Sequence, residues 1–492
     1  MRLQALPVEP VPADQVLAEI SALRALDLPT HGGRLFAYVY DPAVPDLDEL
    51  ALAAHGLSAS VNGLNPTAFP SLLVMENALV GAASALLGGG PAGVSTVVGN
   101  LTSGGTESLI LAVKAARDAR PEIAEPELVL PSSAHAAFAK AASYLRVRVV
   151  PVAVSSATLR PDPAAVAAAI TDRTVLVVCS APSYAHGVID PVEAIAAAAA
   201  ARGVRCHVDA CFGGWTLPYL RRLGVAVPPF DFSVPGVTSI SVDLHKYAYC
   251  PKGVSVLLHR EPGMRAPQYF SYADWPGYTM VNPTIASTRS GGPIASAFAV
   301  VRHVGDAGYL RLAEQTRAAV LGVAGVVSGV EGLELMLGGS AEPESTVVSF
   351  TSTDPGLDLF VLADELTSRG WHTQPQLSYA DLPRSIHLTV TASMAASVGE
   401  FGTALGEAAA AARALGQVDL PAELAAVVGA LDPGQITPDL VASLAEGLGL
   451  GGDGGPLPDR QAMINTLLDA APVPVREALF SAFLGLLQQP TY

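Results

Sequence analysis

Residues 174–179, Thr-Val-Leu-Val-Val-Cys, form a short, continuous apolar run that is rich in β-branched side chains. A run of this kind is typical of a strand that is covered on both faces, as in a parallel sheet with helices on each side. Similar runs occur at 128–130, 147–154, 204–210 and 240–242, and helical patterns separate them. This alternation predicts an α/β domain built on a mainly parallel sheet.

The segments on either side of this block have different patterns. A helical pattern over about 294–325 leads into 347–392, where strand and helix patterns mix in α+β style. After residue 417, prolines and glycines punctuate short amphipathic segments. We therefore expect an N-terminal arm (1–60), a large domain (61–325), a smaller α+β C-terminal domain (326–417) and a helical tail (418–492).

Composition and charge argue against several classes of partner. The chain has 492 residues, 50% of them hydrophobic, and a formal net charge of -17 with 28 Lys and Arg. It has no dense basic segment, so we expect no nucleic-acid partner. The first residues have prolines and acids where a signal peptide needs an apolar stretch, and the longest alanine tract, 194–201, is too short to cross a bilayer. A small-molecule substrate and no membrane anchor are expected.

The cysteines indicate the compartment. There are four, and their spacing is not that of a metal site or of a disulfide-rich secreted protein. We expect a cytoplasmic protein with no metal site. The four are Cys179, Cys206, Cys211 and Cys250.

A lysine follows a histidine directly after one of the strand-like runs, in the stretch Ser-Val-Asp-Leu-His-Lys-Tyr-Ala-Tyr at 241–249. A lysine amine can attack a carbonyl carbon and hold it as a Schiff base. Burial favours the neutral amine that this reaction needs, so we expect Lys246 to lose its proton easily. Taken alone, His245 and Lys246 also fit a surface pair that follows a strand.

The segment Thr-Ser-Gly-Gly-Thr-Glu-Ser at 102–108 precedes a helical pattern. Gly104 and Gly105 allow close backbone approach, and the free N–H groups and positive dipole end of the helix favour an anion such as phosphate. A glycine-rich helix cap without a ligand is the alternative.

Asp209 ends the apolar run at 204–210, where the carboxyl ends of parallel strands line the ligand-binding crevice of α/β proteins. An aspartate that pairs with a pyridine nitrogen keeps it protonated, so that a pyridoxal ring can accept electrons. A helix-capping aspartate is the alternative. The chain order of phosphate turn, aspartate-ended strand and lysine segment matches what pyridoxal phosphate requires, and His135 is a candidate to stack on its ring.

The chain resembles the group II pyridoxal-phosphate-dependent decarboxylases and, within that family, the sphingosine-1-phosphate lyases. The resemblance covers about 32–415, in order, through TSGGTES, SAHAAFAKAASY, HGVIDP, HVDACFGGW, FDFSVPGVTSISVDLHKYAYCPKG, NPTIASTRSGG and GWHTQPQL. It implies the type I fold of pyridoxal-phosphate-dependent transferases, with a mainly parallel seven-stranded sheet in the large domain. It also implies a homodimer with a shared active site.

The resemblance implies roles for individual residues. Lys246 is the expected Schiff-base lysine, Asp209 the pyridine partner and His135 the stacking imidazole. The residues expected to hold the cofactor phosphate are Gly104, Gly105, Thr106 and His245. Thr288 lies in a loop that is expected to reach the phosphate of the neighbouring subunit.

The resemblance also bears on the substrate. Tyr40 and Lys252 match two of the three positions implied for a substrate phosphate, and the third falls at Asn65, a neutral amide where the family has histidine. The implied reaction is retro-aldol cleavage of a phosphorylated long-chain amino alcohol to an aldehyde and ethanolamine phosphate. Amino-acid decarboxylation on the same cofactor is the alternative. A non-catalytic binding homologue is disfavoured because Lys246, Asp209 and His135 are all present.

Overall fold

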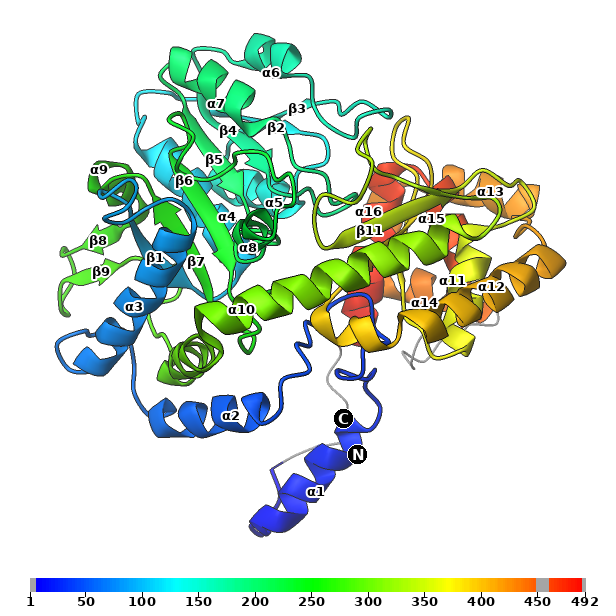
Figure 1. Ribbon diagram of the computed structural model, residues 1–492, viewed down its shortest axis with the longest axis horizontal. Helices are drawn as coiled ribbons and strands as arrows, with labels where there is room; N and C mark the ends of the chain where they lie inside the picture. The colour runs from blue at the N-terminus through cyan, green and yellow to red at the C-terminus, as the bar shows by residue number, and fades with distance from the viewer. Residues whose placement is uncertain (1–5, 448–459, 489–492) are drawn as a thin grey trace.

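The computed structural model describes residues 6–447 and 460–488 and is shown in Figure 1. The glycine- and proline-rich segment 448–459 of the expected tail lies outside the described residues, as do 1–5 and 489–492.

The large domain contains a seven-stranded sheet with strand order β1-β7-β6-β5-β4-β2-β3. Neighbouring strands from β3 to β6 are parallel, whereas β7 is antiparallel to both β6 and β1. The predicted α/β class and mainly parallel seven-stranded sheet are therefore confirmed. The strands are β1 (Val98–Thr102), β2 (Glu127–Pro131), β3 (Arg148–Val152), β4 (Thr174–Ser180), β5 (Arg205–Asp209), β6 (Ser239–Asp243) and β7 (Ser255–His259).

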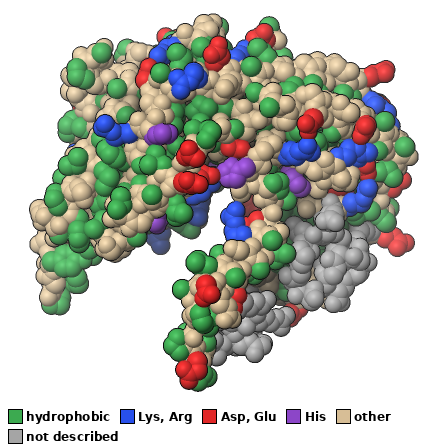
Figure 2. Space-filling model, turned by 60° about the horizontal axis from the view of Figure 1, so that its bottom comes forward, with side chains coloured by type: hydrophobic (Ala, Val, Ile, Leu, Met, Phe, Trp, Pro, Cys, Tyr) green, Lys and Arg blue, Asp and Glu red, His purple; other side chains and the backbone are tan. Residues whose placement is uncertain are grey.

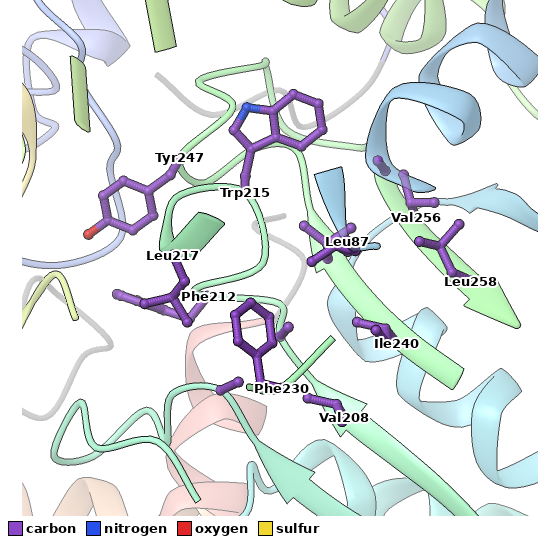
Figure 3. Packing of buried hydrophobic residues seen from close by; sticks show 14 of the residues in the cluster. Leu87, Val208, Phe212, Trp215, Leu217, Phe230, Ile240, Tyr247, Val256 and Leu258 are labelled. Atoms are coloured by element: carbon purple, nitrogen blue, oxygen red, sulfur yellow. The ribbon is translucent and has the colours of Figure 1, made fainter. Parts of the chain in front are cut away.

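The sheet is covered on its faces, which explains its continuous apolar runs. All residues of β2, β4, β6 and β7 are buried. Figure 3 shows aromatic side chains such as Trp215 and Phe230 packed against apolar side chains of neighbouring strands, among them Val208 and Ile240. The helices between the strands are α4 (Gly105–Asp118), α5 (Ala137–Leu145), α6 (Pro163–Ala169), α7 (Val192–Ala201) and α8 (Leu217–Arg222).

Several elements lie outside this sheet and its crossover helices. Helix α10 (Gly291–Ser328) runs beneath the sheet and on into the smaller domain in Figure 1, and Gly305, with a φ of 62°, marks a kink in it. The boundary that we expect at 325/326 falls inside this helix. The remaining elements are α1 (Ala13–Arg24), α2 (Leu47–Ser58), α3 (Pro70–Leu86), α9 (Pro262–Arg265), β8 (Phe270–Tyr272) and β9 (Met280–Asn282).

The smaller C-terminal domain has a four-stranded antiparallel sheet with order β10-β11-β13-β12. Its core includes Phe36 from the expected N-terminal arm, whose ring centroid is 6.0 Å from Trp371 and 4.8 Å from Phe401. The arm thus contributes to the packing of this domain. Its elements are β10 (Leu333–Leu335), β11 (Val347–Ser352), α11 (Leu359–Ser368), β12 (Gln374–Gln376), β13 (Ser385–Thr389) and α12 (Val398–Leu415).

The described part of the tail forms helices that pack on the smaller domain. Asp469 accepts hydrogen bonds from the backbone N–H of Ser378 at 2.7 Å and from Arg384 Nε at 2.6 Å. These contacts fix the tail to the loop between β12 and β13. The helices are α13 (Ala422–Gly429), α14 (Pro438–Gly447), α15 (Ala462–Ala470) and α16 (Val473–Leu487).

Candidate active site

A cavity of about 420 Å³ lies at the edge of the sheet where β4, β5 and β6 end. Carboxyl ends of parallel strands meet at one edge, so side chains far apart in sequence converge there. Figure 2 shows charged and histidine side chains gathered at the head of a hollow in the lower face of the molecule, with hydrophobic side chains on the lobes beside it. The lining residues include seven of the expected site residues, namely Gly104, Gly105, Thr106, His135, Asp209, His245 and Lys246.

The N-terminus of α4 opens into this cavity. Its first N–H groups have no carbonyl partner within the helix, and the dipole adds a partial positive charge. At Gly105 the backbone passes so close to the cavity wall that an added Cβ would lie 2.8 Å from Asp243 Oδ2 and 3.0 Å from Cys211 Sγ. Glycine is thus required here by close approach, as expected for an anion-binding turn. Gly104 has an extended backbone and open space around it.

Asp209 is 8% exposed and ends β5 at the cavity wall. One oxygen, Oδ1, accepts a hydrogen bond from the backbone N–H of Cys211 at 3.1 Å and a longer one from Ser241 Oγ at 3.4 Å. Among the described residues, no protein donor contacts the second oxygen, Oδ2. Asp209 therefore presents a free carboxylate oxygen for a ligand.

Lys246 lies opposite, with Nζ 3.1 Å from Asp243 Oδ2 and 5.2 Å from the centre of the Phe212 ring. Its side chain is 18% exposed. Burial lowers the pKa of Lys246, but the carboxylate of Asp243 and the other acidic groups around the amine outweigh burial and raise it above its ordinary value. The expectation that Lys246 loses its proton easily is wrong for this state, because it took no account of the aspartate three residues earlier.

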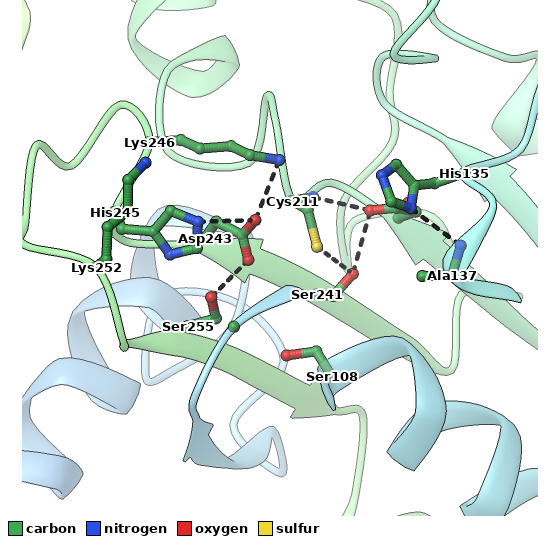
Figure 4. Close-up of polar contacts among 12 residues, drawn as sticks. Ser108, His135, Ala137, Cys211, Ser241, Asp243, His245, Lys246, Lys252 and Ser255 are labelled. Carbon is green, nitrogen blue, oxygen red and sulfur yellow. Dashed lines mark hydrogen bonds and ion pairs between the residues drawn. The ribbon is translucent and has the colours of Figure 1, made fainter. Parts of the chain in front are cut away.

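Asp243 is the centre of a buried polar cluster (Figure 4). Ser255 donates a 2.5 Å hydrogen bond to Oδ1, and His245 Nε2 lies 3.6 Å from Oδ2. Burial tends to raise the pKa of Asp243, but Lys246, His245 and the Ser255 hydroxyl together hold it below its ordinary value. Burial lowers the pKa of His245, and Asp243 only partly opposes this. The cluster therefore pairs one carboxylate with one ammonium group.

His135 lies on the opposite wall, close to where Figure 4 shows the side chains of Cys211 and Ser241. It is exposed on its open side, and its Nδ1 accepts a hydrogen bond from the backbone N–H of Ala137 at 3.2 Å. Its ring meets that of Tyr184 edge-on, with centroids 6.3 Å apart. The imidazole is thus held in place while one face is free to stack on a planar ligand.

Two of the three residues expected at a substrate phosphate, Tyr40 and Lys252, lie together beside this cavity. Lys252 Nζ lies 5.1 Å above the ring of Tyr40 and donates to the carbonyl of Tyr38 at 3.0 Å. Desolvation, and then the charge of Lys246, lowers the pKa of Lys252. Burial raises the pKa of Tyr40, so its phenol stays a neutral hydrogen-bond donor. The structure thus joins the N-terminal arm to the lysine segment at this point.

Asn65 and Thr288 do not reach the Lys246 cavity within one chain. Asn65 is exposed, and its Oδ1 caps a turn by accepting from Thr67 and Ala68. Thr288 is exposed and lines a separate cavity of about 250 Å³. The two cavities share Ser103 and Glu107.

Several site residues were not expected from the sequence, above all Asp243, Ser241 and Ser255. A signal for the first two was present, because Ser239, Ser241 and Asp243 alternate with Ile240 and Val242 along β6. Such alternation puts polar side chains on one face of a strand. Other strands of the sheet, such as β4, are continuous apolar runs, so the polar face of β6 differs from their pattern.

The residues of this cavity suit pyridoxal phosphate. The helix turn at Gly105 provides backbone N–H groups for a phosphate, Lys246 an amine for the aldehyde and the free oxygen of Asp209 an acceptor for a protonated ring nitrogen. His135 offers a flat face for the ring. Each part of the cofactor therefore has a chemically matched partner.

Comparison with known proteins agrees with this assignment. A family model described as the pyridoxal-dependent decarboxylase conserved domain matches residues 5–350, and the chain belongs to this family. It is a pyridoxal-phosphate-dependent enzyme of the lyase class, as the sequence predicts. A second model, for a putative C-terminal helix-turn-helix domain of pyridoxal-dependent enzymes, matches 422–486.

Within the family, the chain is similar to sphingosine-1-phosphate lyases. It is 37% identical to that of Arabidopsis thaliana over 84% of this chain and 70% of the relative, and 33% identical to a probable one of Legionella pneumophila over 70% and 56%. The structure of the Burkholderia pseudomallei lyase superimposes with a TM-score of 0.76 at 32% identity, covering 84% of this chain and 93% of that one. Glutamate decarboxylase of Lactobacillus brevis shares the fold, with a TM-score of 0.72 at 19% identity over 85% of this chain and 96% of that one. In the described ranges, no helix is long and apolar enough to span a membrane.

Proposed function

We propose that the protein cleaves a phosphorylated long-chain amino alcohol by a retro-aldol reaction, giving an aldehyde and ethanolamine phosphate. The observation that carries this proposal is the pairing of Lys252 with Tyr40 beside the Lys246 cavity. A cation and a phenol outside the cofactor residues suit a second phosphate, that of the substrate.

The chain's own residues support the chemistry as follows. Lys246 must lose a proton before its amine can attack an aldehyde, and Asp243 Oδ2, 3.1 Å away, is the nearest acceptor. Pyridoxal phosphate, when bound, supplies a sink for the electrons of the bond that is held perpendicular to its ring. Asp209 would keep the ring nitrogen protonated, and His135 would cover one face of the ring. Gly104, Gly105, Thr106 and His245 would hold the cofactor phosphate.

Amino-acid decarboxylation is the second candidate. It is favoured by one observation, that Asn65 is neutral and uses its side-chain oxygen to cap a turn. A site for a substrate phosphate then has one cation, Lys252, rather than two.

One assay separates the two reactions. Purified protein loaded with pyridoxal phosphate is offered a long-chain base phosphate and, separately, a panel of amino acids. Formation of an aldehyde with ethanolamine phosphate supports the lyase, and release of carbon dioxide with an amine refutes it. Borohydride trapping tests the Schiff base directly, since the chain has lysines only at 114, 140, 246 and 252; an adduct on Lys246 refutes a non-catalytic homologue.

The substrate phosphate site is tested by Lys252→Ala, with Lys140→Ala as the matched control at an exposed lysine. Loss of one charge-assisted contact raises the KM for the phosphorylated substrate by about tenfold or more, because such contacts contribute about 1.5–3 kcal/mol. The absorbance of the bound cofactor should not change. An unchanged KM in Lys252→Ala contradicts the proposed site.

We also propose a homodimer with a shared active site, in which Thr288 and Asn65 serve the partner's cavity. Both are exposed and neither lines the Lys246 cavity of its own chain, and helix α1 has no buried residue. Sedimentation of the loaded enzyme tests this, and a fully active monomer would contradict it. A cytoplasmic location is proposed because all four cysteines are free and buried thiols.

For the domain organisation, we propose that residues 1–60, 61–325, 326–417 and 418–492 act as arm, cofactor domain, small domain and tail. No nucleic-acid partner is proposed for the tail, although it matches a helix-turn-helix model. Acidic side chains outnumber basic ones in 422–486, where the basic ones are Arg460 and Arg476. Arg460 pairs with Glu365 at 2.7 Å, and Arg476 donates to backbone carbonyls, so neither is free for a phosphate backbone.

A further inference from the structure

A row of buried polar side chains lies behind Asp209, on the neighbouring strands β5 and β6. The register of these parallel strands pairs His207 with Ser239 and Asp209 with Ser241. Because side chains alternate along a strand, all four lie on the same face of the sheet. His207 and Ser241 are fully buried, and Ser239 is 5% exposed. Burial of a polar group costs free energy unless the group is hydrogen-bonded, so we expect these side chains to be hydrogen-bonded to one another.

These side chains form a continuous chain of hydrogen bonds. His207 Nδ1 lies 2.9 Å from Ser239 Oγ, and His207 Nε2 lies 3.1 Å from Ser241 Oγ. Ser241 Oγ lies 3.4 Å from Asp209 Oδ1 and also accepts from the thiol of Cys211 at 3.2 Å. Figure 4 shows Ser241 at the junction of the last two contacts.

The number of available protons determines which group donates in each of these hydrogen bonds. Burial lowers the pKa of His207 to about 3, so the ring is neutral and has one N–H. If that proton were on Nδ1, Ser241 would donate to Nε2 and have none left for Asp209. With the proton on Nε2, Ser239 donates to His207, His207 donates to Ser241, and Ser241 donates to Asp209. Only this tautomer puts a proton in every contact and fills both acceptor sites of the Ser241 oxygen.

We propose that Ser241 and His207 are positioning residues for Asp209, with His207 in the Nε2–H form, and that they fix the carboxylate so that its free oxygen faces the cofactor. The proposal rests on the proposed role of Asp209 at the ring nitrogen. Oδ1 is occupied by Cys211 and Ser241, which leaves Oδ2 as the oxygen that can meet the ligand. A carboxylate whose Oδ1 is held by two donors cannot rotate freely, so its other oxygen stays directed toward the cofactor.

The test measures the dissociation constant of pyridoxal phosphate by absorbance titration of the cofactor-free protein. Ser241→Ala removes one donor to a charged acceptor and weakens binding by about tenfold. His207→Phe keeps an aromatic ring beside Phe138 but removes the hydrogen bond that His207 donates to Ser241. The affinity for pyridoxal phosphate should then fall by about threefold. His207→Gln keeps an N–H donor close to the position of Nε2 and restores the affinity to nearly that of the wild type.

Controls separate positioning from a general loss of packing. Ser349→Ala removes a buried serine hydroxyl from the small-domain sheet and should leave cofactor affinity unchanged. Inorganic phosphate, which needs only the helix turn, should compete equally well in the wild type and in Ser241→Ala. Rescue by His207→Gln but not by His207→Phe is a difference that a purely structural role does not produce, and it can be read even if Ser241→Ala fails to fold.

Three outcomes overturn three different statements. If the wild type takes up pyridoxal phosphate and Ser241→Ala and His207→Phe bind it equally well, the positioning role is refuted while the proposed function stands. If His207→Gln and His207→Phe lose affinity for pyridoxal phosphate equally, the proposed hydrogen-bond donation from His207 to Ser241 is refuted. A wild type that takes up no cofactor refutes the proposed function itself.

Discussion

Replacing Asp243 by asparagine should release the proton of Lys246. In the wild type the two charged groups are 3.1 Å apart, and their side chains are 4% and 18% exposed. At that separation and an effective dielectric constant of about 20, the attraction is about 5 kcal/mol. Removal of one partner from a buried pair costs about 3–5 kcal/mol. The fraction of neutral amine at neutral pH should therefore rise by about a hundredfold or more in Asp243→Asn.

The assay is reductive methylation of the cofactor-free protein as a function of pH, with peptides quantified by mass spectrometry. Lys140 is exposed and serves as the internal standard in every sample. In the wild type, Lys246 should react more slowly than Lys140 at neutral pH, because its pKa is raised. In Asp243→Asn, Lys246 should react faster than Lys140, because burial then acts without the charge of Asp243, the largest of the charges that oppose it.

The same change alters the pH dependence of stability. In the wild type, the raised pKa of Lys246 contributes stability that is present below its ordinary pKa and lost only as the pH rises through the folded value. The lowered pKa of Asp243 contributes stability that is present above its ordinary pKa and lost as the pH falls through the folded value. Near neutral pH both contributions are complete.

In Asp243→Asn, a buried ammonium has no partner, so the variant should lose stability as the pH falls from about 9 to 6, whereas the wild type should not. Ser255→Ala, which leaves the ion pair intact, is the matched comparison and should resemble the wild type. If the ratio of Lys246 to Lys140 reactivity follows the same pH curve in the wild type and in Asp243→Asn, the carboxylate does not hold the ammonium.

Three further predictions test other parts of the molecule. Gly105→Ala puts a Cβ 2.8 Å from Asp243 Oδ2 and should weaken cofactor binding by at least about tenfold in an absorbance titration, whereas Gly325→Ala, with open space, should not. Burial raises the pKa of Asp190 to about 7. As the pH rises from about 4 to 7, the unfolded chain releases this proton before the folded one does, so the stability of the fold falls. The isosteric Asp190→Asn should remove that slope from the thermal midpoint, and an unchanged slope assigns it elsewhere. Asp469→Ala removes the contacts of the tail with 377–384, and hydrogen exchange there should speed up by about tenfold, while equal rates would show that the tail does not hold the loop.

The sequence predicted most of the sheet, and the two strands it missed have physical reasons. Strand β1 contains Gly99 and Asn100, which have low strand propensity, so its pattern is weak. Strand β7 is a short apolar run, Ser255–His259, and such runs are ambiguous without their neighbours. The number of strands in the sheet was expected from the family resemblance.

The sequence alone predicted the cofactor class, because Asp209 and Lys246 follow strand-like runs whose carboxyl ends meet at one edge of a parallel sheet, and the turn at Gly105 begins a helical pattern. It could not determine the charge of Lys246, which depends on the position of Asp243 3.1 Å away. Nor could it show that His207 and Ser241 support Asp209, because that contact depends on the register between β5 and β6. Residue types and their order are properties of the chain, whereas distances of a few ångströms between strands, and the pKa values that depend on them, exist only after folding.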